Sequence, residues 1–196
     1  AGCDVFQMFS RNPRGWSFLP LSKESCDTFR SKIRSNNLLA FDHMPYLPNL
    51  ASPKSDIYDK SVAALTSELE RCNLLGIPYL VTHLGHHLGD GIAGGRERVI
   101  RAINAALEAS DNSVILLLEN TAGEKNSVGS TFEHIRGILD GISHQSRIGI
   151  CFDTCHAFAA GYELRTESGI RETLQQFDSS IGLNHLKMIH LNDTKG

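Results

Sequence analysis

Six side chains of the kinds that bind metal ions recur along the chain, each beside a short apolar run. They are imidazoles and carboxylates: His43, His83, Glu119, Asp153, His156 and His190. A mixed set of this kind, with no thiolate, is typical of an open catalytic site for zinc or manganese. A carboxylate can also bridge two ions about 3.5–4 Å apart, the arrangement used for phosphodiester hydrolysis.

Each residue also has an ordinary structural interpretation. His43, in Phe-Asp-His-Met-Pro-Tyr, fits a hydrogen-bonded loop histidine, and Glu119 fits a salt bridge or a helix N-cap. Asp153 can simply cap the helix that follows it. Taken singly, these residues therefore indicate little, and the prediction depends on whether the fold brings them together.

Two neighbouring features have similar alternatives. His83 begins a His-x-x-His-His cluster, in which His86 and His87 can face solvent and leave His83 as the ligand. Cys155 lies among the candidate ligands, and its neighbours favour a packed small residue over a nucleophile.

Short apolar runs alternate with amphipathic stretches along the chain. The runs predict strands at Val5–Phe9, Leu38–His43, Tyr79–Leu84, Val114–Asn120, Ile148–Thr154 and Met188–Asp193. Runs as continuous as Val-Ile-Leu-Leu-Leu suit parallel strands covered on both faces. Helical spacing predicts helices at Asp56–Leu75 and Arg96–Ala109, and Gly76-Ile77-Pro78 ends the first of them.

The candidate ligands His43, His83, Glu119, Asp153 and His190 each lie at or just past the end of a different predicted strand. In a parallel barrel, all of those ends lie on one rim, where such enzymes place their chemistry. A doubly wound open sheet is the alternative fold. The residues after the first strand favour the barrel, because they read Ser-Arg-Asn-Pro-Arg and lack a Gly-rich phosphate fingerprint.

The fold class predicted is therefore α/β, a TIM-type (β/α)8 barrel of which about six βα units are present. A closed barrel needs eight strands and typically about 250 residues, whereas this chain has 196 residues. We expect residues 1–196 to be a single, incomplete domain. One βα unit would precede Ala1, where the chain starts without Met, and at least one would follow Gly196.

The composition bears on the kind of protein and the kind of site. A formal charge of -3 gives no global basic signature, although a local basic face is compatible with it. Five scattered cysteines argue against a disulfide framework and a Cys-based zinc finger. With no signal peptide and no apolar run near 18 residues, we expect an intracellular protein that does not cross a membrane.

Four motifs, spread in order over the chain, resemble those of the endonuclease IV family. Residues 151–162, Cys-Phe-Asp-Thr-Cys-His-Ala-Phe-Ala-Ala-Gly-Tyr, resemble its Asp-Thr-Cys-His-x-Phe-Ala-Ala-Gly-Tyr signature. Residues 119–123 resemble its Glu-Asn-x-Ala-Gly element, and residues 190–193 its His-Leu-Asn-Asp element. Residues 9–16 resemble the family's Asn-x-Arg-x-Trp DNA loop.

The resemblance implies a base-excision repair enzyme with three zinc ions that cuts double-stranded DNA 5′ to an abasic site. It would leave a 3′-hydroxyl and a 5′-deoxyribose phosphate, with the metal supplying the hydroxide nucleophile. His43 and His83 would bind one zinc ion, and the catalytic Glu119 would bridge it to the second. Asp153 and His190 would bind the second ion. The third would be bound by His156.

The resemblance also implies DNA-binding residues and a setting. Arg14 and Tyr46 match side chains that the family inserts into the bent duplex, and Asn12 belongs to the same loop motif. Such an enzyme would act as a monomer, without an obligate protein partner. It would work in the cytoplasm and nucleoid of a prokaryote, or in the nucleus or mitochondria of a eukaryote.

The chain stops at Gly196, before some features that the family has. The family has an Asp-x-His pair after the His-Leu-Asn-Asp strand and a Glu near the last strand, and the first barrel strand is also missing here. We therefore predict that this stretch alone is inactive and folds poorly. Two alternatives stay open: a metal-dependent sugar isomerase or epimerase, which has no use for the loop around Arg14, and a non-catalytic protein that binds abasic DNA.

Overall fold

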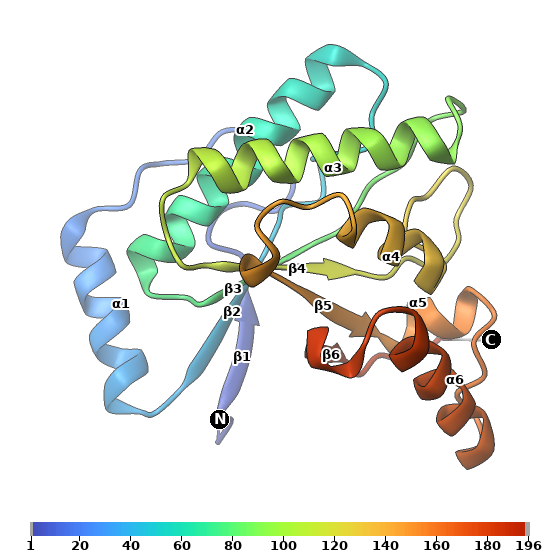
Figure 1. The fold of residues 1–196 in the computed structure, drawn as a ribbon. Coiled ribbons are helices and arrows are strands. Elements are labelled where there is room, and N and C mark those ends of the chain that lie inside the picture. The colour runs from blue at the N-terminus through green and yellow to red at the C-terminus, as the bar shows by residue number, and fades with distance from the viewer. Residues whose placement is uncertain (1, 195–196) are drawn as a thin grey trace.

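Six parallel strands form one sheet in the computed structural model, which describes residues 2–194 (Figure 1). Their spatial order is their sequence order: β1 (Val5–Met8), β2 (Leu39–His43), β3 (Tyr79–Thr82), β4 (Ile115–Glu119), β5 (Ile148–Asp153) and β6 (Leu186–His190). The sheet curls into part of a barrel. Its two edge strands are linked by a hydrogen bond in which His190 Nε2 donates to Gln7 Oε1 over 2.9 Å.

Helices connect the strands and surround the outside of the curled sheet (Figure 1). They are α1 (Lys23–Ser35), α2 (Ser55–Leu75), α3 (Ile92–Ala109), α4 (Phe132–Leu139), α5 (Thr154–Ala159) and α6 (Glu167–Ser180), with short 3-10 turns η1 (Gln145–Arg147) and η2 (Leu183–His185). The alternation of parallel strands and outer helices confirms a TIM-type barrel architecture, with six strands present among the described residues.

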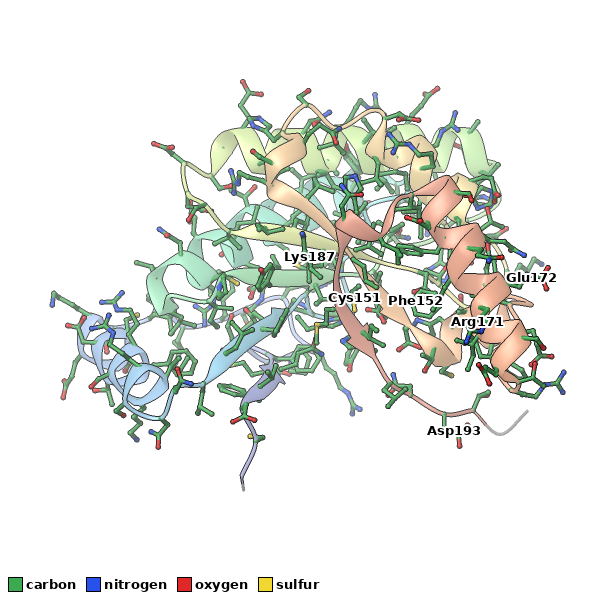
Figure 2. All side chains as sticks on the ribbon, turned by 60° about the horizontal axis from the view of Figure 1, so that its bottom comes forward. Cys151, Phe152, Arg171, Glu172, Lys187 and Asp193 are labelled. Atoms are coloured by element: carbon green, nitrogen blue, oxygen red, sulfur yellow. The ribbon has the colours of Figure 1, made fainter. Side chains whose placement is uncertain are left out.

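The apolar residues form two layers, as strands covered on both faces require. The larger core lies between the sheet and the helices, and a smaller one, around Phe41, Val81 and Leu117, lines the inside of the curl. Cys151 and Phe152, neighbours on β5 in Figure 2, belong to different layers, with Cys151 inside and Phe152 on the helix side. One face of each strand is therefore free to direct side chains into the barrel.

All six predicted strands are present, with small differences at their ends. Most of the predicted strands run past the true end; β4, for example, ends at Glu119 rather than Asn120. The last strand is predicted too late in the chain, since β6 begins at Leu186 and ends at His190. The pairing of β5 with β6 contains a register shift at Ile150/Cys151.

The two predicted helices are confirmed as α2 and α3, and α3 begins earlier than predicted, at Ile92. Gly76 does end α2, in a left-handed conformation with φ 70° that favours glycine. Within residues 2–194, the five cysteines are free, and no helix is long and apolar enough to cross a membrane. The predictions about Ala1 and Gly196 lie outside the described residues.

Candidate metal centre

The predicted ligands meet at the carboxyl ends of the strands, as a barrel requires. His43, Glu119, Asp153 and His190 are the last residues of β2, β4, β5 and β6, and His83 directly follows β3. His156 comes from the first turn of α5, three residues past Asp153. The fold therefore brings all six side chains to one rim.

Glu119 is the hub of the cluster, although only 1% of its surface is exposed. Its Oε2 lies 3.3 Å from His43 Nε2 and 3.0 Å from His83 Nε2. Its Oε1 lies 3.0 Å from His190 Nδ1 and 3.4 Å from His156 Nδ1. Each carboxylate oxygen thus faces a separate pair of imidazoles, the arrangement expected of a group that bridges two sites.

Asp153 both caps a helix and faces the other candidate ligands. Its Oδ1 accepts the backbone N–H of His156 over 2.8 Å and so caps α5. Its Oδ2 lies 3.6 Å from His190 Nδ1 and accepts a hydrogen bond from Asn192 Nδ2 over 2.6 Å. The cap fixes the carboxylate plane, and the second oxygen stays turned toward the cluster.

Outer hydrogen bonds orient two of the imidazoles. His43 Nδ1 lies 2.6 Å from the carbonyl oxygen of Met44, which can only accept, so Nδ1 carries a proton and Nε2 is the ring nitrogen that faces Glu119. His190 Nε2 donates to Gln7 Oε1 over 2.9 Å and leaves Nδ1 facing the carboxylates. Metal-binding histidines are held by outer acceptors in this way.

Asn120 holds the next part of the rim together, and sequence reasoning does not single it out. Its side chain accepts from the backbone N–H of Asp153 over 2.7 Å and donates to the carbonyl of Asp153 over 3.0 Å. Its own carbonyl oxygen lies 2.9 Å from His156 Nδ1. Asn120 follows Glu119 in the Glu-Asn-x-Ala-Gly motif, which was the available signal. For Gln7, the only signal is its alternation on β1.

Hydrogen bonds between the imidazoles and the carboxylates shift the pKa values of the cluster. Burial alone would raise the pKa of Glu119, but hydrogen bonds from the imidazoles outweigh it and hold that pKa far below its usual range. The pKa of Asp153 is also lowered, because hydrogen bonds from His190 and His156 outweigh its burial. Hydrogen bonds to Asp153, Cys151 and Glu119 raise the pKa of His190 to about 12. The carboxylates therefore require compensating positive charge, which protons or a bound cation can supply.

Two groups of three ligand atoms have the spacing that a metal ion needs. His43, His83 and Glu119 form one group, and Glu119, Asp153 and His156 form the other, with ligand atoms within 4.8 Å of one another in each. The shared member is Glu119. Imidazole and carboxylate donors around a partly open rim fit a metal ion such as zinc, and Glu119 would be able to serve both groups.

The DNA-binding candidates have different relations to the rim. Tyr46 is 57% exposed and, with all six candidate ligands, lines a rim cavity of about 490 Å³. Its ring packs on Phe9 at 5.3 Å, and its backbone N–H donates to the carbonyl of Pro13 over 2.9 Å. Asn12 and Arg14 are exposed in the first βα loop and do not line that cavity. The Tyr46–Pro13 bond connects the two places.

His86 and His87 do not line the rim cavity. His86 is exposed and forms an isolated bridge with Ser127, and His87 Nδ1 accepts from the backbone N–H of Gly91 over 3.0 Å. Cys155 is partly buried, beside a different cavity. Of the three clustered histidines, only His83 reaches Glu119.

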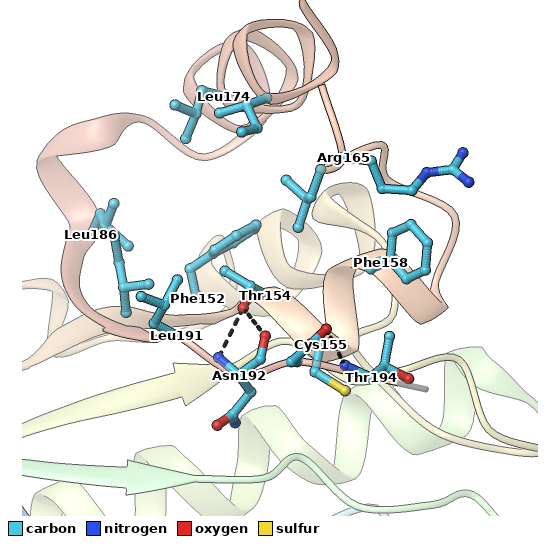
Figure 3. Close-up of a pocket in the computed structure, with 14 residues that line it drawn as sticks. Phe152, Thr154, Cys155, Phe158, Arg165, Leu174, Leu186, Leu191, Asn192 and Thr194 are labelled. Carbon is cyan, nitrogen blue, oxygen red and sulfur yellow. Dashed lines mark hydrogen bonds between the residues drawn. The ribbon is translucent and has the colours of Figure 1, made fainter. Parts of the chain in front are cut away.

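That second cavity, of about 630 Å³, lies on the outer side of β5 and β6 between α5 and α6 (Figure 3). Its lining is mostly apolar, with Phe152, Phe158 and Leu174 among it. Thr154 closes one side by pairing with the backbone of Asn192, donating over 2.6 Å and accepting over 3.0 Å. Although larger, this cavity lacks the clustered imidazoles and carboxylates of the rim.

Comparison with known proteins bears on the family and the fold. The family model described as xylose isomerase-like TIM barrel matches residues 1–196. A probable endonuclease 4 of Methanoculleus marisnigri is 59% identical over 198 residues, covering 100% of this chain and 70% of the relative. The crystal structure of endonuclease IV from Thermus thermophilus is similar with a TM-score of 0.88 at 34% identity, covering 100% of this chain and 68% of that one.

A sugar-enzyme fold is related as well. The structure of a D-tagatose 3-epimerase-like protein has a TM-score of 0.78 at 18% identity, covering 98% of this chain and 68% of that one. At that identity, the similarity concerns the fold alone. The relative that is 59% identical over 100% of this chain decides the family, and this chain belongs to the endonuclease IV family of xylose isomerase-like TIM barrels.

Proposed function

We propose that this chain provides the metal-binding rim of a base-excision repair endonuclease. The enzyme would hydrolyse the phosphodiester 5′ to an abasic site in double-stranded DNA and leave a 3′-hydroxyl and a 5′-deoxyribose phosphate. Family membership and the names of its relatives support a nuclease. The observation that carries the proposal is Glu119, a buried carboxylate shared by two groups of candidate ligands.

The residues present fit zinc, although manganese is compatible with the same donors. His43 and His83 would hold one ion with Glu119, and Asp153 and His190 the second, with Glu119 between them. His156 would belong to a third. When bound, such ions lower the pKa of water toward about 7 and neutralise charge on the phosphate. Glu119 and Asp153 would contribute negative charge, which the hydrogen bonds from the imidazoles favour by lowering the pKa of both carboxyl groups.

The exposed side chains beside the rim supply recognition. Tyr46 stands next to the imidazoles, with its ring centroid 6.1 Å from that of His43. An aromatic ring there can fill the stack that an extruded abasic nucleotide leaves. Arg14 would act from the neighbouring loop as a planar cation, and Asn12 shapes that loop, since its Oδ1 accepts the backbone N–H of Arg14 over 3.0 Å. The enzyme would act as a monomer.

The test is incision of a labelled duplex that carries one tetrahydrofuran abasic-site analogue, using the full-length protein. Incision 5′ to the lesion that is lost on chelation and restored by Zn²⁺ supports the proposal. Ketose epimerisation without incision would favour the sugar-enzyme alternative instead. Metal-independent binding of the abasic duplex without incision would indicate a lesion-binding protein.

A separate proposal concerns the activity of residues 1–196 on their own. We propose that residues 1–196 alone have no incision activity, because Ile189 on β6 and Leu191 just after it are 53% and 88% exposed and make an unstable edge. A cooperative thermal transition together with zinc-dependent incision by this stretch would refute that proposal.

A further inference from the structure

A second cluster of buried charges lies on the outer side of β2, behind the candidate metal centre. Glu68 and Arg71 come from α2, Arg11 follows β1, and Asp42 belongs to β2. Glu68 and Asp42 are 0% exposed and Arg71 is 6% exposed. Among the described residues, none of these side chains lines the rim cavity. Burying four charges is expensive unless they are well paired, so their partners indicate what they hold in place.

The partners of Glu68 and Arg71 belong to the first βα loop. Glu68 Oε1 pairs with Arg11 Nε at 2.6 Å, and Glu68 Oε2 accepts from Ser10 Oγ over 2.7 Å. Arg71 Nε donates to Ser10 Oγ over 3.0 Å, and its Nη2 donates to the carbonyl of Ser10. Arg71 Nη1 donates to the carbonyl of Leu19 over 3.2 Å. Two side chains of one helix therefore bind both ends of the segment Ser10–Leu19.

An aromatic ring of the same segment covers the cluster. The guanidinium carbon of Arg11 lies 4.5 Å from the ring centroid of Phe18, and that of Arg71 lies 5.1 Å from it. A cation over a ring face is attracted by the ring quadrupole, and more so when water is excluded. Phe18 thus adds a third attachment, so the return half of the loop packs against α2.

The cluster also continues to the strand that carries a candidate ligand. Asp42 Oδ1 accepts the backbone N–H of Ser10 over 2.9 Å and the backbone N–H of His43 over 3.0 Å. The beginning of the loop is therefore fixed relative to His43. Asn12 and Arg14 lie within the clamped segment and are exposed.

We propose that Glu68 and Arg71 are positioning residues for damaged-DNA recognition: their buried side chains together clamp both ends of the segment Ser10–Leu19 and so present Asn12 and Arg14 at a fixed place beside the rim. This inference rests on the proposed function. A loop that is ordered before binding loses less conformational freedom on DNA, which favours affinity. The clamp acts through the loop, and none of the contacts of Glu68 and Arg71 given above involves an imidazole of the rim.

The distinguishing variant is Glu68→Gln, which keeps the side-chain shape and removes the charge. It is assayed at pH 8, where the Glu68 carboxyl is ionised even though burial raises its pKa to about 7. The matched control is Glu70→Gln, two residues along α2 and exposed. Arg71→Lys keeps a positive charge but cannot reach both carbonyls. Ser10→Ala removes the hydroxyl between Glu68 and Arg71 and serves if Glu68→Gln fails to fold.

Three measurements on the full-length, zinc-loaded protein decide the matter. They are zinc content, hydrogen exchange of the amides of residues 10–19, and single-turnover incision of an abasic duplex over a range of protein concentrations. We expect faster exchange in residues 10–19 and a rise of about 10- to 100-fold in the half-saturating concentration. The rate at saturation should stay within about threefold, with unchanged zinc content. Arg71→Lys and Ser10→Ala should give smaller shifts, and Glu70→Gln none.

The opposite results overturn the inference. Unchanged exchange in residues 10–19 would mean that these side chains do not hold the segment. A fall in zinc content or in the saturated rate, with unchanged half-saturation, would mean that the cluster supports the rim instead. If the wild-type protein does not incise abasic DNA, the proposed function fails on its own, and the exchange measurement still shows whether Glu68 clamps the loop.

Discussion

Two buried glutamates, on opposite faces of the same sheet, have different partners. Glu119 points into the curl of the barrel and is 1% exposed, whereas Glu68 lies on the helix side and is 0% exposed. The partners of Glu119 are imidazoles contributed by other strands and by α5. Those of Glu68 are guanidinium groups, from Arg11 and Arg71, together with a serine hydroxyl.

The partner decides what a buried carboxylate can do. An imidazole can give up its proton near neutral pH and offer a lone pair, so a metal ion can replace the protons around Glu119. A guanidinium stays protonated and has no lone pair to offer. The guanidinium partners of Glu68 therefore cannot bind a metal ion, and they hold the neighbouring loop in place instead. The pKa values of the two glutamates also differ. That of Glu119 is far below its usual range, whereas burial raises that of Glu68 to about 7.

The largest expected effect comes from Glu119→Gln. The neutral amide cannot balance two cations, so we expect incision to fall by about 10³-fold or more and zinc content to drop, since metal chemistry supplies several kcal/mol. The incision rate and zinc per protein are measured together. Glu108→Gln on the exposed side of α3 is the matched control. A variant that keeps full zinc and a rate within tenfold of wild type would remove Glu119 from its bridging role.

Arg71→Met tests the other cluster. The substitution leaves the carbonyls of Ser10 and Leu19 without the guanidinium that donates to them and removes a cation 3.9 Å from Glu68, so we expect a loss of about 3–5 kcal/mol in the free energy of unfolding. Urea denaturation measures it, with the exposed Arg101→Met as control. Zinc content should not change. A loss below about 1 kcal/mol would show that the outer cluster is not needed for stability.

Gln7→Leu tests how far an edge strand supports the rim. It removes the side-chain oxygen that accepts from His190 Nε2 on the opposite edge of the sheet, and it leaves every candidate ligand unsubstituted. Loss of such an outer contact typically weakens metal affinity about 10- to 100-fold. Competition with a calibrated chelator measures the affinity, and Gln176→Leu on α6 is the control. Equal affinities would show that Asp153 and Glu119 alone orient His190.

The fold was largely predictable because its strands are apolar on both faces. Runs such as Ile115–Glu119 stand out against any neighbouring pattern, and α2 and α3 are long enough to show their period. The shorter or more polar helices were not predicted, although α1, α4 and α6 have hydroxyl N-caps at Ser22, Thr131 and Thr166. Few residues of α1 and α6 are buried, and α4 is only eight residues long, so hydrophobic periodicity gives a weak signal there.

The side chains gathered at the rim were predictable because strand ends meet in a barrel; their metal-binding role stays a prediction. The residues that orient them were not, because their role depends on contacts between distant strands. Gln7 and His190 are 183 positions apart, and their bond exists only when the sheet curls. The outer cluster is similar, since Glu68 and Arg71 look like an ordinary polar pair on a helix until the loop from Ser10 packs over them.

A further expected effect is a dependence of stability on pH that belongs to Glu68. Its folded-state pKa, about 7, lies above its usual 4.5, despite Ser10 and two guanidinium groups, because burial dominates and Asp42 is close. Between pH 4.5 and 7, the folded protein therefore holds a proton that the unfolded chain has released. The free energy of unfolding should fall as pH rises through that window and level off above it, by at most about 1.4 kcal/mol per pH unit.

Urea titrations of wild-type protein and Glu68→Gln at several pH values, with metal chelated throughout, isolate this contribution. The groups that face Glu68 are Arg11, Asp42, Arg71 and Cys72, and all of them are retained in the variant. The difference in unfolding free energy, wild type minus variant, should decrease from pH 4.5 to 7. A difference that increases with pH would mean that the guanidinium groups outweigh burial, so Glu68 and Glu119 would titrate alike and their contrast would rest on metal binding alone.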